Sequence, residues 1–499
     1  MITILPHASE KINHQVDKAC LVNRFRQHLP EPCIVTEAEA LKPFECDALA
    51  AYQCVPWIVL LPETRVQIQA VLRICYALGV PVVARGAGTG LAGGALPLAN
   101  GVLLSLAKFN RILDVDIKNR CARVEPGVRN LAISKAVSEY GLYYAPDPSS
   151  QIACTIGGNV AENSGGVHCL KYGLTTHNIL RLKVLTMAGE EVTIGAHALD
   201  SSGYDLLAIM TGSEGLLGIV VEVTVKLLPL PEQAQVILAA FDAIATAAEA
   251  VAGIIAAGLI PAGLEMMDKA AIRAAEDFVH AGYPRDAQAI LLCELDGTAE
   301  QVVEEVQQAY RLLQAYGAVA VRTAQSESER QLMWAGRKAA FPAVGRISPD
   351  YFCMDGTIPR RALAKVLTGI ADLSVQYGLA VVNVFHAGDG NLHPLILYNA
   401  DVPGELQKAE RFGGDILKLS VAVGGTITGE HGVGVEKINY MCIQFSNAEL
   451  LQMQALKHAF DAKGLLNPGK AVPSLHRCAE FGALHVHKGQ LPHPELERF

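Results

Sequence analysis

The chain has 499 residues, with 41 Lys and Arg against 50 Asp and Glu, which gives a formal net charge of −9 at pH 7. Hydrophobic residues make up 51% and charged residues 18%, which excludes a disordered chain; the acidic balance argues against nucleic acid as the main partner. At about 150 residues per domain, the length predicts two to four domains. The mean hydropathy of +0.26 is high for a soluble protein and requires either a membrane segment or a large apolar interior with subunit interfaces.

One segment is a candidate for crossing a membrane, residues 243–260 (AIATAAEAVAGIIAAGLI). It has the length of a spanning helix, but alanine dominates it, Glu249 lies within it, and no Lys or Arg flanks it. The N-terminus has neither a basic region nor a long apolar core, so no signal peptide is expected. The sequence therefore predicts a cytoplasmic protein without a membrane-spanning helix.

The first half of the chain alternates short apolar strands with helices. Residues 1–55 carry weak signals and are expected to form a helical lead-in. A helix is expected over 64–78, because apolar residues recur at helical spacing and Gly79 ends the pattern. The sequence Pro229-Leu230-Pro231 closes this block, which gives a first domain over 56–231. Strands are expected at 80–84, 102–106, 112–116, 122–124, 179–187 and 218–228, and a second helix at 130–139.

The pattern changes after this block. Residues 232–425 are predicted to form a second α+β domain, an antiparallel or mixed sheet backed by helices. Residues 426–499 follow as a C-terminal segment with a helix at 447–461 and a loop-rich tail. The strands of the second domain are expected at 235–240, 289–295, 318–323, 351–358, 380–385 and 394–398, and its helices at 242–257, 299–316, 326–340, 360–376 and 405–423.

A glycine-rich stretch follows the strand expected at 80–84. Gly88, Gly90 and Gly93 match G-x-G-x-x-G, which alone is a weak signal for a nicotinamide-binding Rossmann fold. That fold needs a helix directly after the glycines, with its N-terminus at the pyrophosphate. Residues 95–101 (ALPLANG) contain a proline and a glycine that leave no room for such a helix. The sequence therefore argues against a Rossmann fold.

Three glycine-rich segments nevertheless indicate a cofactor site. Residues 85–90 (RGAGTG) offer consecutive backbone N–H groups that suit a diphosphate. Residues 146–166 contain PDPSS and TIGGNVAENSGG, which are small and polar in a chain that is 51% hydrophobic. Residues 212–215 (GSEG) precede a long apolar strand. A flexible turn explains one such segment, but three together predict an extended polar ligand.

These segments resemble the FAD-binding domain of the vanillyl-alcohol oxidase or PCMH type, in which loops of two lobes hold the flavin diphosphate. HAGDGNLH at 386–393, GEHG at 429–432 and GLLNPGK at 464–470 are similar to motifs of that family's D-lactate dehydrogenase-like branch. The similarity runs from about residue 55 to the C-terminus. The tail at 477–499 resembles that of the glycolate-oxidising flavoprotein subunits of the branch.

The resemblance implies an α+β fold. It comprises a two-lobed FAD-binding domain at 56–231, a ferredoxin-like α+β substrate or cap domain at 232–425, and a helical C-terminal segment at 426–499 that completes the flavin site. FAD is expected to bind without a covalent tether, although His168 and Tyr172 follow the second glycine-rich segment. The cofactor-binding residues that match the family's motifs are Arg85, Gly86, Ala87, Gly88, Thr89, Gly90, Pro146, Asp147, Ser149, Ser150, Thr155, Gly157, Gly158, Asn159, Ala161, Asn163, Gly165, Glu214, Gly215, Ile219 and Asn467.

The C-terminal motifs contain a candidate metal set. His386 and His393 flank the sequence AGDGNL at the end of a strand, and Glu430 follows in GEHG. Two histidines and a carboxylate can hold a catalytic metal, although buried or turn-capping histidines are common alternatives. The resemblance implies a divalent metal, typically zinc, on these three residues, beside the substrate bound near the two histidines. His431 is then the expected general base, or else a residue that only orients Glu430.

A carboxylate substrate requires a cation. Arg337 stands at the position of the family's carboxylate-binding arginine and is expected to be catalytic, whereas Lys338 beside it is more simply a solvated helix residue. Phe341, Cys353 and Leu395 stand where relatives that oxidise 2-hydroxyglutarate carry polar residues. These replacements favour a small monoacid over a diacid.

The resemblance thus implies FAD-dependent oxidation of a small 2-hydroxy acid to the 2-oxo acid, with glycolate as the expected substrate and D-lactate as the alternative. A non-catalytic FAD-binding subunit is a further alternative, but it would be expected to lack the histidines and Glu430. The family also implies two partners, a second FAD-binding subunit and an iron–sulfur subunit, and through them peripheral association with the membrane.

Two further sequence features bear on cofactors. None of the 12 cysteines forms a CxxC pair, which argues against an iron–sulfur cluster in this chain. The tail contains four irregularly spaced histidines, which favour an interface segment over another metal site: His476, His485, His487 and His493.

Overall fold

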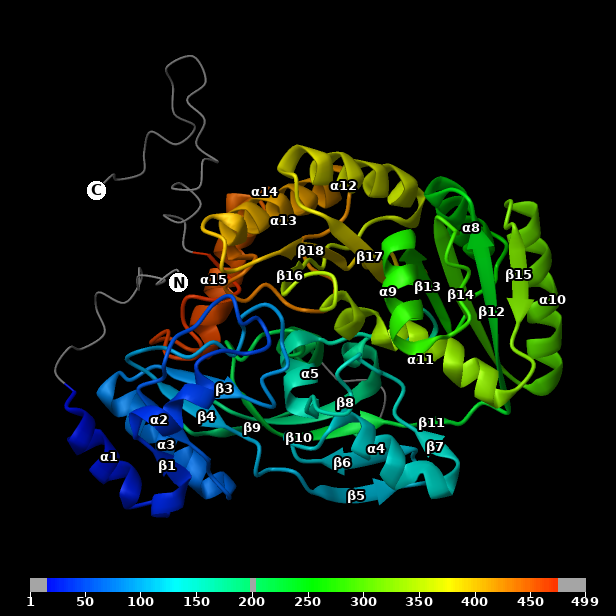
Figure 1. Ribbon diagram of the computed structural model, residues 1–499. Helices are drawn as coiled ribbons and strands as arrows, with labels where there is room; N and C mark the ends of the chain where they lie inside the picture. The colour runs from blue at the N-terminus through cyan, green and yellow to red at the C-terminus, as the bar shows by residue number, and fades with distance from the viewer. Residues whose placement is uncertain (1–15, 198–202, 474–499) are drawn as a thin grey trace.

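The computed structural model describes residues 16–197 and 203–473, so the four tail histidines lie outside the described residues. Figure 1 shows two bodies: the first half of the chain forms the lower one, and the second half forms the upper one. The last described residues return to the lower body, where Leu466 makes a parallel bridge with Val82. The fold is mixed α and β, as the sequence predicts.

Two main sheets form the lower body. The first is a four-stranded sheet that is parallel except at its β1 edge, in the order β1 (Ile34–Val35), β2 (Ile58–Leu60), β4 (Val102–Ser105) and β3 (Val82–Arg85). The second is a five-stranded antiparallel sheet, in the order β5 (Ile112–Asp116), β6 (Cys121–Val124), β10 (Ile219–Lys226), β8 (Ile179–Leu185) and β9 (Glu191–Gly195). A short antiparallel pair is formed by β7 (Leu142–Tyr143) and β11 (Leu228–Pro229).

Helix α3 (Arg65–Leu78) confirms the helix expected over 64–78. A capping box formed by Thr64 and Gln67 starts it, and Gly79 ends it with a φ of 69°. The N-terminal residues join the same hydrophobic core, because β1 pairs with β2 and α1 (Lys18–Arg26) buries apolar side chains there. The remaining helices of this body are α2 (Ala38–Leu41), α4 (Asn130–Val137), α5 (Ile156–Glu162), α6 (Cys169–Tyr172) and α7 (Leu206–Met210).

A seven-stranded sheet, antiparallel throughout, forms the centre of the upper body. All six strands predicted there are present, and a seventh, β13, was not predicted. The strand order is β15 (Ala320–Thr323), β12 (Gln233–Phe241), β14 (Ala289–Gly297), β13 (Gly263–Asp268), β17 (Val381–His386), β18 (Pro394–Tyr398) and β16 (Asp350–Cys353).

Helices cover both faces of this sheet. Two of the long ones, α10 (Ala299–Ala315) and α11 (Glu327–Val344), begin at side-chain caps: Thr298 accepts from Gln301 N, and Ser326 accepts from Glu329 N. One face carries α8 (Ile244–Ala256), α10 (Ala299–Ala315), α12 (Leu363–Tyr377) and α13 (Glu405–Ala422). The other face carries α9 (Lys269–Val279) and α11 (Glu327–Val344), and the C-terminal helices are α14 (Met441–Gln444) and α15 (Asn447–Phe460).

Neither strand β13 nor helix α9 is predicted from the sequence, and for β13 the reason is physical. The strand sequence GLEMMD has no polar alternation, because the strand is buried along its whole length in the middle of the sheet. It also contains two acidic residues, which argue against a buried strand unless their partners are known. Asp268 finds such partners, since it caps α9 at Ala271 N and accepts from Asn383.

The candidate membrane segment is an ordinary core element. Helix α8 ends at Ala256 and packs its alanine-rich face into the upper core. Among the described residues, no helix combines the length and the apolar character needed to cross a membrane.

A buried polar network joins the two bodies. On the lower body, His168 pairs through Nδ1 with Asp147 at 2.8 Å and through Nε2 with Glu294 of β14 at 3.2 Å. Lys171 and Tyr172 of α6 both contact the Asp296 carboxylate of the same strand, at 2.6 and 2.7 Å. Because these contacts cross from α6 to β14, they fix the upper body against the lower one.

Replacement of His168 with Gln should weaken this junction in a pH-dependent way. Burial alone would lower the pKa of His168, but Asp147 and Glu294 together raise it well above its usual value. A raised histidine pKa contributes stability fully below about pH 6.5, and this contribution is lost as the pH rises through the folded-state pKa. A charge-assisted hydrogen bond contributes about 1.5–3 kcal/mol, so the variant should melt a few degrees lower at pH 6. The difference in melting temperature should shrink in alkaline buffer; a difference that grows with pH would contradict this account.

Candidate active site

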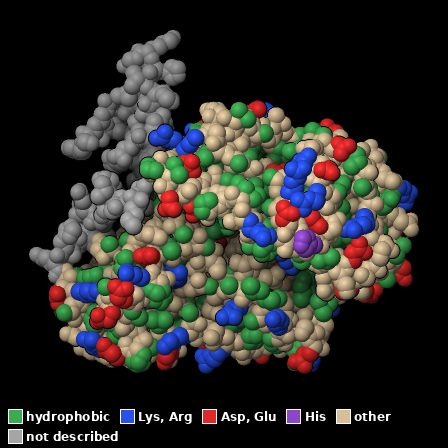
Figure 2. Space-filling view, viewed as in Figure 1, with side chains coloured by type: hydrophobic (Ala, Val, Ile, Leu, Met, Phe, Trp, Pro, Cys, Tyr) green, Lys and Arg blue, Asp and Glu red, His purple; other side chains and the backbone are tan. Residues whose placement is uncertain are grey.

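A cavity of about 420 Å³ lies where the two bodies meet. Figure 2 shows the surface hollowed between them, with hydrophobic side chains around the crease. Its lower wall consists of the three glycine-rich segments, and its upper wall includes Lys338, Phe341, His393 and the loop that carries His431. The volume is within the range of small-molecule and cofactor sites, about 300–1,000 Å³.

Most of the predicted cofactor residues line this cavity. No helix follows GTGLAG between residues 86 and 101, which agrees with the rejection of a Rossmann fold. The second segment does contain a helix, α5, which the sequence analysis had not predicted. The predicted residues in the wall are Arg85, Gly86, Ala87, Gly88, Thr89, Gly90, Ser149, Ser150, Thr155, Gly157, Gly158, Asn159, Ala161, Glu214, Gly215 and Ile219.

The wall provides polar atoms that lack partners within the described chain. Thr155 Oγ1 and Glu162 Oε2 are both buried and both lack a hydrogen-bond partner. Burial, and then the neighbouring Glu214, raise the pKa of Glu162 well above its usual value. A Cβ added at Gly86 would collide with Thr155 Oγ1, so glycine is needed where the two segments meet. Since buried polar groups are nearly always paired, these atoms fit a polar ligand such as FAD.

The other predicted cofactor residues do not line the cavity, and two of them, Asn163 and Asn467, hold segments of its wall in place. Asn467 donates through Nδ2 to Glu214 O at 2.7 Å and to Gly94 O at 3.0 Å, which joins the C-terminal motif to two glycine-rich segments. Asn163 caps α5 with a φ of 54°. The residues that do not line the cavity are Pro146, Asp147, Asn163, Gly165 and Asn467.

The predicted metal set comes together at one end of the cavity. His386 ends β17 and His393 directly precedes β18, and both Nε2 atoms approach Glu430 Oε1, at 3.4 and 3.0 Å. The three ligand atoms lie within 4.8 Å of one another. Burial would raise the pKa of Glu430, but the two histidines lower it well below its usual value. Two imidazoles and a carboxylate at this spacing fit a divalent metal ion.

Glu265 of β13 supports this set, and the sequence analysis missed it. It pairs across the strands with His386, and its Oε1 lies 2.7 Å from His386 Nδ1. Its other oxygen, Oε2, lies 2.8 Å from Arg337 Nε and 2.7 Å from Arg337 Nη2. The side chains of Glu265 and Arg337 are only 1% and 3% exposed. Because the Nδ1 edge of His386 is taken by Glu265, its Nε2 is left for a metal.

The two cations of α11 have different surroundings. Arg337 is buried against Glu265 and is not part of the cavity wall, whereas Lys338 lines the cavity. Arg337 donates a hydrogen bond to Glu265 through Nε, while its Nη2 is buried without a hydrogen-bond partner among the described residues, so the guanidinium keeps N–H groups for another partner.

Asp355, another residue missed from the sequence, holds the GEHG loop. Its fully buried carboxylate accepts from the backbone N–H groups of Gly429, Glu430 and His431, at 3.0, 3.2 and 2.9 Å. Thr428 Oγ1 donates to the same carboxylate at 2.6 Å. Asp355 therefore holds in position the loop that carries Glu430, the metal-ligand candidate, and His431, the base candidate.

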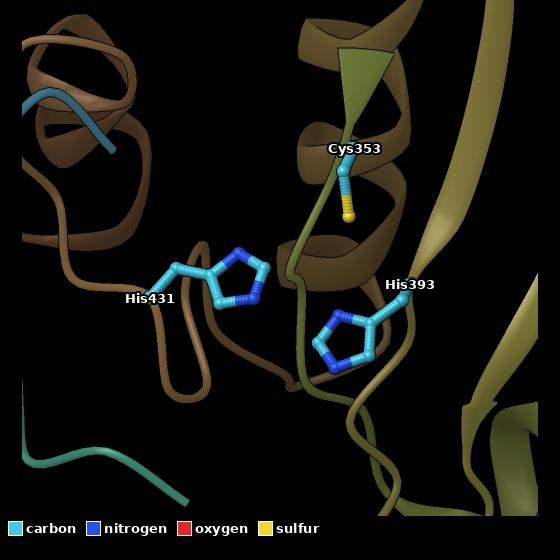
Figure 3. A group of neighbouring side chains, drawn as sticks. All are labelled: Cys353, His393 and His431. Atoms are coloured by element: carbon cyan, nitrogen blue, oxygen red, sulfur yellow. The ribbon is translucent and has the colours of Figure 1, made fainter. Parts of the chain in front are cut away.

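His431 has the properties of a base. Its Nδ1 is buried and has no hydrogen-bond partner among residues 16–197 and 203–473, and burial is the main cause that lowers the pKa of its ring to about 4. The ring is therefore neutral at pH 7 with a lone pair available. It stacks on His393 with ring centroids 5.0 Å apart and an interplanar angle of 6°. Figure 3 shows the two rings side by side, with Cys353 above the ring of His393.

The chain matches two family descriptions. Residues 56–195 match "FAD binding domain", and residues 230–471 match "FAD linked oxidases, C-terminal domain". Among solved structures, p-cresol methylhydroxylase with bound substrate has a TM-score of 0.78 at 17% identity, over 91% of this chain and 97% of that one. At that identity the similarity concerns the fold.

Full-length relatives agree with these matches. Glycolate oxidase subunit GlcD of Escherichia coli K12 is 63% identical over 97% of both chains, and GlcD of Bacillus subtilis 168 is 40% identical over 86% of this chain and 91% of that one. A D-lactate dehydrogenase of Anaerostipes hadrus is 32% identical over 90% of this chain and 96% of that one. The protein therefore belongs to the FAD-linked oxidase family, with the family's FAD-binding domain followed by its C-terminal domain.

Proposed function

We propose that this protein is the FAD-carrying catalytic subunit of a glycolate oxidase and converts glycolate to glyoxylate. The proposal depends on one observation: the neutral, unpartnered ring of His431 lies beside a two-histidine, one-carboxylate set in the wall of the glycine-rich cavity. The identity of 63% to GlcD over 97% of both chains supports glycolate as the substrate.

D-lactate is the second candidate substrate, because a D-lactate dehydrogenase is 32% identical to the chain. Both acids are small, and Phe341 fills space beside His393, with ring centroids 6.4 Å apart. Cys353 and Leu395 nearby are buried and offer no cation to a second carboxylate. A diacid such as 2-hydroxyglutarate is therefore disfavoured.

Different residues of the chain serve different parts of the proposed reaction. His386, His393 and Glu430 would hold a divalent metal, typically zinc, which when bound polarises the hydroxyl or carboxylate oxygen of the substrate. The residues of the glycine-rich wall would hold FAD, which would supply the acceptor for the Cα hydrogen as hydride. His431 takes the hydroxyl proton on a ring nitrogen as the C–O bond becomes C=O. Arg337, aligned by Glu265, and Lys338 supply positive charge for the substrate carboxylate.

The subunit names of the relatives support an assembly with other chains. We expect a second FAD-binding subunit and an iron–sulfur subunit, since this chain lacks a CxxC pair for a cluster. Through these partners the protein would be cytoplasmic and peripheral at the membrane.

Anaerobic mixing of the purified, FAD-loaded protein with candidate acids tests the function. Glycolate should bleach the oxidised flavin band, D-lactate should bleach it more slowly, and L-lactate and D-2-hydroxyglutarate should leave it unchanged. If none of the four acids reduces the flavin, the proposed activity is wrong.

Replacement of His431 with Asn should retain FAD and slow flavin reduction by glycolate about 10²- to 10⁴-fold, the usual contribution of a general base. His458→Asn, at an exposed position of α15, is the matched control and should react like the wild type. Loss of FAD from the His431 variant, or an unchanged rate, would remove His431 from the base role.

Replacement of Lys338 with Gln should raise the KM for glycolate about 10-fold and leave kcat almost unchanged, because the lysine contacts substrate in both ground and transition states. Arg337→Lys should raise KM as well and should also release metal, since lysine cannot keep the fork that holds Glu265. Lys365→Gln on the exposed side of α12 serves as the control. A Lys338 variant with unchanged KM would assign the substrate carboxylate to Arg337 alone.

Replacement of Glu265 with Gln should weaken metal retention about 10- to 100-fold, because the neutral amide no longer polarises His386. Zinc content after dialysis is the measurement, and added zinc should restore flavin reduction. The exposed Glu304→Gln in α10 should retain zinc like the wild type. Equal zinc content in the Glu265 variant and the wild type would contradict this role.

A further inference from the structure

A second set of metal-binding atoms adjoins the first. Cys353 at the end of β16, His393 and His431 each offer one ligand atom, and these atoms lie within 4.8 Å of one another. Figure 3 shows the thiol directed toward the two rings. A thiolate with two imidazoles is a ligand set that favours thiophilic ions such as zinc and cadmium.

The two sets use opposite edges of His393. Its Nε2 faces Glu430 at 3.0 Å and belongs to the first set. Its Nδ1 faces Met354 O at 3.4 Å, and Cys353 Sγ lies 3.4 Å from the same carbonyl. The thiol is therefore at the Nδ1 edge of the ring, so an ion held there does not compete for the atom that the first set uses.

The remaining members are available to an ion that enters the cavity. His431 Nδ1 has no hydrogen-bond partner, and both histidines line the cavity wall. Cys353 is 5% exposed, and the hydrogen bond that its thiol makes within the described part of the chain goes to the backbone carbonyl of Met354, so the bond that it gives up is weak. The charged groups around Cys353 are Asp355, Glu436 and Glu430, which are acidic, and Lys437, which is basic, so the surroundings carry more negative than positive charge.

We propose that Cys353, His393 and His431 form an inhibitory site for a second, thiophilic divalent ion. Binding forms one metal–sulfur and two metal–nitrogen bonds and releases the thiol proton to solvent. With the first metal on Nε2 of His393, the Nδ1 proton of that ring is released as well, and the ring bridges the two ions as an imidazolate. The ion binds the ring nitrogen of His431 that would otherwise accept the substrate proton. Because the substrate hydroxyl then has no base, oxidation stops. The inhibitory consequence rests on the proposed role of His431, whereas the ion site itself does not.

Cadmium titration of the metal- and FAD-loaded protein tests this site, with ultraviolet absorption of the cadmium–thiolate bond and anaerobic flavin reduction by glycolate as the two measurements. Relative to Cys353→Ser and Cys353→Ala, the wild type should gain the absorption of one additional cadmium–thiolate bond. Cadmium should slow flavin reduction more than 10-fold in the wild type and less than 2-fold in either variant. Cys293→Ser, which removes a buried thiol of β14 far along the sheet, should behave as the wild type does.

Two results would overturn the site: wild-type absorption no greater than that of both Cys353 variants, or variants inhibited as strongly as the wild type. FAD absorption of each variant checks that it is folded, and the alanine variant replaces the serine variant if the latter loses FAD. If glycolate never reduces the flavin, the proposed function fails, but the cadmium–thiolate absorption still decides whether the site exists.

Discussion

One buried carboxylate supports the chemistry of the whole site. Glu265 lies between Arg337 and His386 at distances of 2.7–2.8 Å and is almost entirely removed from solvent. Removing either partner would leave the buried carboxylate only partly compensated, and breaking a buried ion pair typically costs about 3–5 kcal/mol. The arrangement therefore determines both which nitrogen of His386 is free to bind a metal and where the Arg337 guanidinium lies. A central strand of the upper sheet carries it, so its position is as rigid as the sheet.

His431, the proposed base, is also held in position by a buried carboxylate. The buried Asp355 carboxylate accepts hydrogen bonds from the backbone N–H groups of the GEHG loop. These bonds hold His431 and Glu430 in position, although neither lies in a helix or strand. The glycine-rich wall opposite belongs to the lower body, and the His168 network holds the two bodies together. The site exists only where the two bodies meet. Among the described residues, the apolar content is accounted for by the buried cores of these bodies, and no helix is suited to cross a membrane.

Much of this arrangement can be predicted from sequence, and the exceptions have a common cause. Helix α3 carries its own start and stop signals, and Pro97 excludes a Rossmann helix, so both features were predictable locally. Glu265 and Asp355 were not, because their partners lie 121 and 76 residues away and only the folded sheet brings them together. An acidic residue in an apolar run is the one signal that pointed to Glu265. Motif similarity placed Arg337 near the substrate, but could not reveal that a buried carboxylate already holds it.

The central claim is that Glu430 and the Nε2 atoms of His386 and His393 hold the metal that acts on the substrate. X-ray absorption at the zinc edge, on protein with FAD and one equivalent of zinc, tests it most directly. The account predicts nitrogen and oxygen ligands at about 2.0–2.2 Å, two of them imidazoles, and no sulfur. A zinc–sulfur shell at about 2.3 Å would contradict it, because the metal would then prefer the Cys353 side of His393.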